Sequence, residues 1–134
     1  MPHLTCAACG RALTRGCRWG GQADYDSGCA MGAAPVPEGV LVRFDREDAA
    51  PIYRGGEVIG VKVFSPAGAI AADPKDVRPS ALVSVGRDNG CCGSDGQGGP
   101  NRARLCGAVV ATAWSDCWTQ AEVRFLPDAV VVCD

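Results

Sequence analysis

The sequence predicts a mainly β fold, a small antiparallel sheet or sandwich with little helix, in which cysteines bound to a metal ion pin the chain. Three observations lead to this prediction. Short β-branched runs recur along the 134 residues, no long segment keeps helical periodicity without Gly or Pro, and nine cysteines occur beside an aromatic content of 6%. Few large side chains are available to fill a core, so another stabilising element is needed.

Six short runs rich in β-branched residues predict the strands. Three lie in the middle of the chain, at residues 40–44, 57–64 and 81–85. Three more follow Cys106, at residues 108–114, 121–126 and 129–133. Pro127-Asp128 is a turn signal between the last two runs, so we expect a C-terminal hairpin there.

Helix is expected only as a turn or two within residues 66–77, because Gly68 and Pro74 interrupt that segment. We expect one domain over residues 1–134, since this length is common for a single domain. Its parts are an N-terminal cysteine region (1–34), the central strands (38–88), and a C-terminal part (89–134) with a Gly-rich loop, the second cysteine group and the hairpin.

Charge and hydropathy limit the classes of partner. The formal net charge is −2 and the isoelectric point is near 5.3, so the chain lacks the basic field that draws proteins onto phosphate backbones. No stretch approaches the roughly 18 to 20 apolar residues of a membrane span, and the first residues do not resemble a signal peptide. We therefore expect a cytoplasmic protein with no membrane contact, and nucleic acid is disfavoured as a partner.

The nine cysteines point to metal ligation rather than to disulfides. Disulfides are rare in the reducing cytosol, and an odd number of cysteines cannot pair completely. The cysteines fall into two groups and one isolated residue. The N-terminal group is Cys6, Cys9, Cys17 and Cys29, the C-terminal group is Cys91, Cys92, Cys106 and Cys117, and Cys133 stands alone.

The segment Cys6-Ala7-Ala8-Cys9-Gly10 is the most specific motif. Two thiolates separated by two residues can bind one cation, and the glycine after them allows the backbone to turn away with positive φ. This motif resembles one knuckle of the zinc-ribbon family over about a dozen residues. The resemblance implies that Cys6 and Cys9 are two of four ligands to a zinc ion. The chain has no second CxxC, which the family normally uses as its second knuckle.

We predict that Cys106 and Cys117 complete this site, because Cys106-Gly107 repeats the end of a knuckle and a predicted strand separates the two cysteines. A competing assignment takes one residue of the Cys91-Cys92 pair instead. A second site could combine that residue with Cys17 and Cys29, because a closed zinc site requires four ligands. Cys133 is expected to be a buried thiol. His3 could substitute as a ligand but is expected to be solvated near the chain end.

Other motifs favour structural interpretations. The Gly-rich segment 89–100 could cradle an anion, but it lacks a nucleotide-binding pattern and is expected to be an exposed loop carrying Cys91 and Cys92. Trp114 and Trp118 flank Cys117, and we expect at least one of them to shield the metal. The charged run Asp45, Glu47 and Asp48 is expected to be a solvated turn.

These features predict a non-enzymatic module that binds a protein partner through the Gly-rich loop and neighbouring strand edges. Cys/His catalysis is disfavoured, because His3 is the single histidine of the chain. A thiol redox or metal-sensing protein is the first alternative, since exposed vicinal thiols can be labile. A zinc-ribbon nucleic-acid binder is the second, and it would use Arg11, Arg15 and Arg18 around the first knuckle.

Overall fold

The computed structural model describes residues 1–86 and 90–134, and within these residues the protein is mainly β, as predicted. The predicted boundary between the central strands and the C-terminal part, at Asp88 and Asn89, lies outside the described residues. The strands are β1 (His3–Cys6), β2 (Arg18–Gly20), β3 (Val40–Arg43), β4 (Asp48–Arg54), β5 (Glu57–Ser65), β6 (Ile70–Ala72), β7 (Val83–Ser84), β8 (Arg102–Ala103), β9 (Val109–Trp114), β10 (Glu122–Phe125) and β11 (Val130–Cys133). No helix in the described part of the chain is long and apolar enough to cross a membrane.

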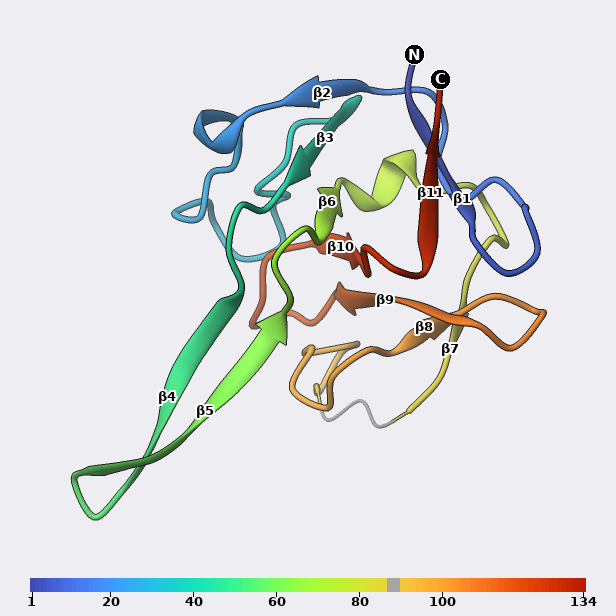
Figure 1. The fold of residues 1–134 in the computed structure, drawn as a ribbon. Helices are drawn as coiled ribbons and strands as arrows, with labels where there is room; N and C mark the ends of the chain where they lie inside the picture. Colours follow the sequence, from blue (N-terminus) through green and yellow to red (C-terminus); the bar gives the residue numbers. More distant parts are fainter. Residues whose placement is uncertain (87–89) are drawn as a thin grey trace.

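The main sheet contains seven strands in the order β2-β3-β6-β10-β9-β8-β7 (Figure 1). It is mixed rather than purely antiparallel, because β2 and β3 run parallel while the other neighbours are antiparallel. Residues 66–77, expected to carry a helical turn, divide into β6 and the 3-10 turn η2 (Pro74–Asp76). The other 3-10 turn, η1 (Gln22–Asp24), follows β2.

The two chain ends pair with each other as β1 and β11, so the predicted C-terminal hairpin is wrong. A turn does form after β10, where Ala129 N donates to Leu126 O. After this turn β11 leaves the main sheet. It cannot pair with β10, because both edges of β10 are already occupied by β6 and β9. The β1–β11 pair forms a second layer beside the sheet (Figure 1).

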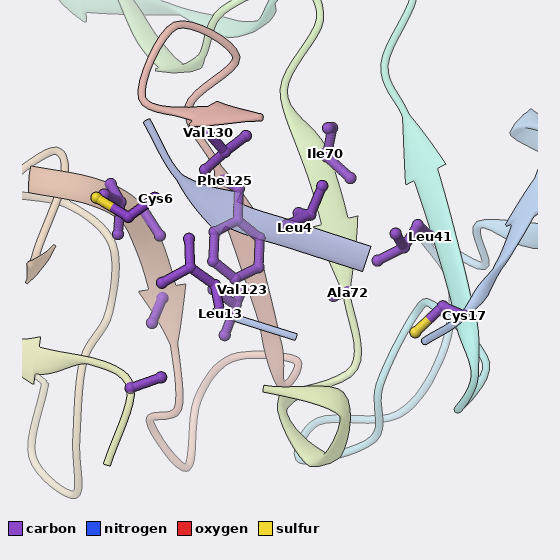
Figure 2. Packing of buried hydrophobic residues seen from close by; sticks show 14 residues of the cluster. Leu4, Cys6, Leu13, Cys17, Leu41, Ile70, Ala72, Val123, Phe125 and Val130 are labelled. Carbon is purple, nitrogen blue, oxygen red and sulfur yellow. The ribbon is translucent and has the colours of Figure 1, made fainter. Parts of the chain in front are cut away.

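The core lies between this second layer and one face of the main sheet. Leu4 of β1 and Phe125 of β10 are fully buried there, together with Leu13 from the loop after β1 (Figure 2). Such burial contributes roughly 1.5–3 kcal/mol for each large apolar side chain. Cys6 and Cys17 lie at opposite margins of this cluster, and the sulfur of Cys6 points away from Phe125.

The opposite face of the sheet carries a buried polar centre. Arg124 alternates with Phe125 along β10, so its side chain points away from the main core. Its guanidinium lies 4.8 Å from the ring centre of Phe44 and 4.5 Å from that of Trp114. It also bonds Asp48, the first residue of β4, which was expected in a solvated turn. Arg124 thereby ties the base of the β4–β5 hairpin to the sheet.

The β4–β5 hairpin extends away from the rest of the molecule (Figure 1). The run at 57–64 was predicted as a strand, but its partner was not, because Asp48–Arg54 contains Pro51 and charged ends. The two strands form their own two-stranded sheet. Most of their side chains are exposed, including large apolar ones.

Candidate metal centres

The first cysteine cluster joins the end of β1 to the turn between β8 and β9. Cys6 is the last residue of β1, Cys9 lies in the turn that follows, and Cys106 lies in the β8–β9 turn. The three sulfur atoms lie within 4.8 Å of one another. Cys6 is buried, whereas Cys9 and Cys106 are exposed. Three of the four predicted zinc ligands are therefore brought together.

Glycines shape both turns of this cluster. Gly10 has φ +75° and donates its N–H to Cys6 O at 2.8 Å, which closes the turn between the two cysteines. Gly107 has φ +93° and donates its N–H to Arg104 O at 2.9 Å. A side chain at positive φ is strained, so glycine is favoured at both positions. The two Cys-Gly endings noted in the sequence thus adopt a similar local form.

The buried side chain of Arg104 supplies positive charge beside the first cluster. Its Nη1 donates to Ala81 O, while its Nε has no hydrogen-bond partner among the described residues. A hydrogen bond from the backbone of Arg11, with a second from the Arg104 guanidinium, lowers the pKa of Cys9 to about 7. A cation and donors near a thiol favour the thiolate, which is the form that binds metals.

Strand geometry separates His3 and Cys133 from the first cluster. His3 and Cys6 are three residues apart on β1, so their side chains point to opposite faces. Cys133 is paired with His3, and its sulfur lies 3.6 Å from Thr5 Oγ1 on that same face. The described residues therefore supply three thiols to this cluster.

Cys117, the fourth predicted ligand, lies elsewhere. Cys106 precedes β9 and Cys117 follows it, so the two residues occupy opposite ends of an extended strand. From Val109 to Trp114 such a strand spans about 16 Å, because each residue advances the chain by about 3.3 Å. The prediction that this strand would return the chain to the first cluster is wrong, because it did not take the length of the strand into account.

Cys117 instead joins a second cluster with Cys91 and Cys92. Its sulfur lies 3.0 Å from Cys91 Sγ and 2.8 Å from Cys92 Sγ, and the two vicinal sulfurs are 3.4 Å apart. Only one of the vicinal pair was expected to join a site, yet the bent backbone at 91–93 directs both towards Cys117. All three thiols are exposed.

Asp116 belongs to the second cluster and was not singled out in the sequence. Its carboxylate is buried and accepts the backbone N–H of Cys92 at 2.8 Å, which holds the pKa of this carboxyl below its ordinary value. Hydrogen bonds with Cys92 and Cys91, which favour the protonated thiol of Cys117, raise its pKa to about 12. The position of Asp116 directly before a cysteine was the one local signal of its role.

The remaining cysteines lie in neither cluster, so the predicted second site with Cys17 and Cys29 is not assembled. Cys17 is fully buried, and this burial raises the pKa of its thiol. Cys29 is partly buried, with its sulfur 3.6 Å from Ala33 O. Trp118, one of the two expected shields, is 76% exposed, whereas Trp114 is partly buried against Arg124.

Comparison with known proteins adds no family to this description. No protein-family model matches the chain, and no curated protein or solved structure matches it. Inferences about function therefore rest on the two cysteine clusters and on the surface of the fold.

Proposed function

We propose that this protein is a zinc-stabilised, non-enzymatic module that binds a protein partner through the β4–β5 hairpin. One observation carries the proposal. Val58, Val61 and Val63 share one face of β5 and are 58%, 61% and 48% exposed. Exposed apolar patches of this kind are typical of interaction surfaces.

These residues form a continuous apolar stripe on one face of the hairpin. Paired residues of neighbouring strands share a face, and Val58, Val61 and Val63 pair with residues that alternate along β4. Those partners are Tyr53, Pro51 and Ala49, and they extend the stripe. All six side chains are exposed and uncharged. Solvent is an unfavourable environment for such a face, and a partner would relieve that cost.

The occupant that suits this surface is an extended apolar segment of another protein, added beside β5. The described residues place β4 on one side of β5 and no strand on the other, so one edge has free backbone groups. β5 contains no proline, whereas Pro51 deprives β4 of one N–H donor. Strand addition at an open edge combines backbone hydrogen bonds with side-chain contacts. With a net charge of −2, a protein is favoured over nucleic acid.

In this proposal the first cluster is a structural zinc site that combines one zinc-ribbon-like knuckle, at Cys6 and Cys9, with Cys106. Cys6, Cys9 and Cys106 would bind the ion as thiolates, and Arg104 would offset the excess negative charge. The ion would fasten β1 to the β8–β9 turn and so hold the second layer against the sheet. Thiolate sites of this kind favour a reducing compartment such as the cytoplasm.

The charged cleft on the molecule supports a structural interpretation. It has a volume of about 540 Å³ and includes Tyr25, Asp48 and Arg124 in its lining. Arg124 donates to four partners, which are Asp48, Ser65, Glu122 and Tyr25. Its donors are thus engaged within the protein, so Arg124 is not free to bind an anionic substrate in the cleft.

The test compares Val61→Lys with Ile52→Lys in affinity purification. Ile52 is 42% exposed, but it pairs with Gly60 and so lies on the opposite face of the hairpin from the Val61–Pro51 pair, which makes it a matched control. We expect one protein to bind the wild type and Ile52→Lys, and to bind Val61→Lys at least tenfold more weakly when both components are purified. Equal binding by all three variants would contradict the proposal. Sedimentation of the isolated protein shows whether that partner is a second copy of the chain.

A thiol-based sensor is the second candidate function. The observation that favours it is the exposure of Cys91, Cys92 and Cys117, whose sulfurs are in mutual contact. Reversible oxidation of these thiols under mild oxidant, with loss of partner binding, would favour the sensor over a module of fixed activity.

A further inference from the structure

We infer that Cys91, Cys92 and Cys117 form a second metal site, which holds a thiophilic divalent ion such as Zn²⁺ in exchangeable form. This inference goes beyond the proposed function and does not depend on it. It rests on the construction of the loop that carries the vicinal cysteines, on the sulfur positions and on the exposure of the three ligands.

The loop that carries Cys91 and Cys92 is hydrogen-bonded to the segment that carries Cys117. Ser115 N donates to Ser94 O at 2.8 Å, and Ser94 N donates to Ser115 Oγ at 3.1 Å. One residue further along, Asp95 and Trp114 form an antiparallel β-bridge. These contacts fix the backbone that follows Cys92 and the backbone that precedes Cys117, so the approach of the sulfurs follows from a built arrangement.

Asp116 positions this loop through a hydrogen bond to its backbone. Its Oδ1 accepts the N–H of Cys92, and the carboxylate is buried beneath the turn. The close approach requires glycine at position 90, where a Cβ would lie 2.7 Å from Asp116 Cγ. Glycine is also required at position 93, where a Cβ would lie 2.8 Å from Ser115 O. Asp116 is thus a positioning residue, and the three thiols are the ligands.

The sulfur separations fit a shared ion with a small adjustment. They range from 2.8 to 3.4 Å, well beyond the ~2.05 Å of a disulfide bond. Three sulfurs bound tetrahedrally to one zinc at ~2.3 Å lie about 3.8 Å apart. An outward shift of about half an ångström by each exposed side chain reaches that geometry. The sulfurs converge on one point although solvent is open to all of them.

Exposure distinguishes this site from the first cluster. There, Cys6 is 1% exposed at the end of a strand, and the buried cation of Arg104 lies beside the thiols. At the second site all three ligands are exposed, and the neighbouring charged group is the Asp116 carboxylate, 3.8 Å from Cys117 Sγ. Competing chelators can therefore reach every ligand of the second site, whereas one ligand of the first is covered.

The test measures zinc in protein purified without oxygen and follows its transfer to the chelator 4-(2-pyridylazo)resorcinol. We expect two zinc ions per chain, one released at least tenfold faster than the other. Cys92→Ser and Cys117→Ser should each lose the fast phase and retain the slow one, and Cys9→Ser should do the reverse. Cys29→Ser, outside both clusters, should keep both ions. Retention of the full wild-type zinc content by Cys117→Ser, or a single zinc that Cys9→Ser removes and Cys117→Ser retains, would overturn the inference. A single zinc that Cys117→Ser removes and Cys9→Ser retains would support the inference and contradict the first site.

A measurement on the wild type keeps the inference testable if a variant fails to fold. Alkylation by N-ethylmaleimide, mapped by mass spectrometry after release of the fast zinc, should label Cys91 and Cys92 while Cys9 and Cys106 remain protected. Labelling of the first cluster at that stage would contradict the assignment, and so would a disulfide between Cys92 and Cys117 in the oxygen-free protein.

Discussion

Arg124 Nε donates to Glu122 Oε1 at 2.6 Å, and both residues are less than 10% exposed. The two residues alternate with the apolar Val123 and Phe125 along β10. One strand therefore contributes apolar side chains to the main core and an ion pair to the opposite face of the same sheet. The remaining donors of Arg124 bind groups from other segments, including Asp48 at the base of the hairpin.

Replacing this arginine should destabilise the protein strongly. Arg124→Met keeps much of the side-chain volume but leaves the Glu122 carboxylate buried without its partner. Removing one member of a buried ion pair costs about 3–5 kcal/mol, so we expect a loss of that size in the free energy of unfolding measured with urea. Arg46→Met is the control, because Arg46 lines the same cleft as Arg124 but is exposed. A change below 1 kcal/mol for Arg124→Met would show that the pair is not structural.

The first cysteine cluster gives a second prediction. Cys106→Ser should abolish the slowly released zinc and lower the thermal midpoint, because metal binding at a structural site contributes to folding. Cys133→Ser should keep full zinc content, since its side chain lies on the face of β1 opposite Cys6. Elemental analysis and thermal denaturation measure the two effects. Full zinc retention by Cys106→Ser would remove this cluster from the proposal.

Much of the strand pattern could be predicted from local sequence. The runs that became β3, β5, β9, β10 and β11 are β-branched, and their predicted bounds agree with the structure to within a residue. The pairing could not be predicted, because it depends on contacts between distant segments. The turn signal Pro127-Asp128 marks a real reversal, yet β11 pairs with β1 from the other end of the chain. β4 was missed because its proline and charges conceal a strand whose partner is β5.

The candidate site was likewise predictable only where local sequence determines it. The motif at Cys6 and Cys9 and the Cys-Gly ending at Cys106 are local signals, and the structure brings those three residues together. The position of Cys117 depends on the direction and length of β9, which no spacing rule provides. The convergence of Cys91 and Cys92 depends on Asp116, whose buried carboxylate holds a loop more than twenty residues earlier in the sequence.

The packing of Trp114 on the Gly-rich loop gives a third prediction. A Cβ at Gly96 would overlap the indole of Trp114, and Gly96 also has φ +70°. Gly99 has φ +85° with open space around it, so Gly99→Ala carries the backbone strain without the overlap. We expect Gly96→Ala to cost about 1–3 kcal/mol more than Gly99→Ala in urea denaturation, because overpacking displaces the ring. Equal costs would mean that the indole moves aside freely.

The last prediction concerns the thiolate of Cys9. A hydrogen bond from the backbone of Arg11 and one from the Arg104 side chain lower the pKa of Cys9 to about 7, whereas hydrogen bonds with Cys92 and Cys91 that favour the protonated thiol raise that of Cys117 to about 12. The thiolate is the reactive form, so a lowered pKa extends reactivity to lower pH. Immediately after zinc is removed, alkylation of Cys9 by iodoacetamide should therefore rise with pH to half its maximum near pH 7, while Cys117 stays nearly unreactive up to pH 9. Arg104→Met should move the Cys9 midpoint upward, because the variant lacks the donor and the positive charge that favour the thiolate. Peptide mass spectrometry over pH 5 to 10 reports both residues in one sample. A Cys9 midpoint at or above 8.5 would show that Arg11 and Arg104 do not activate this thiol.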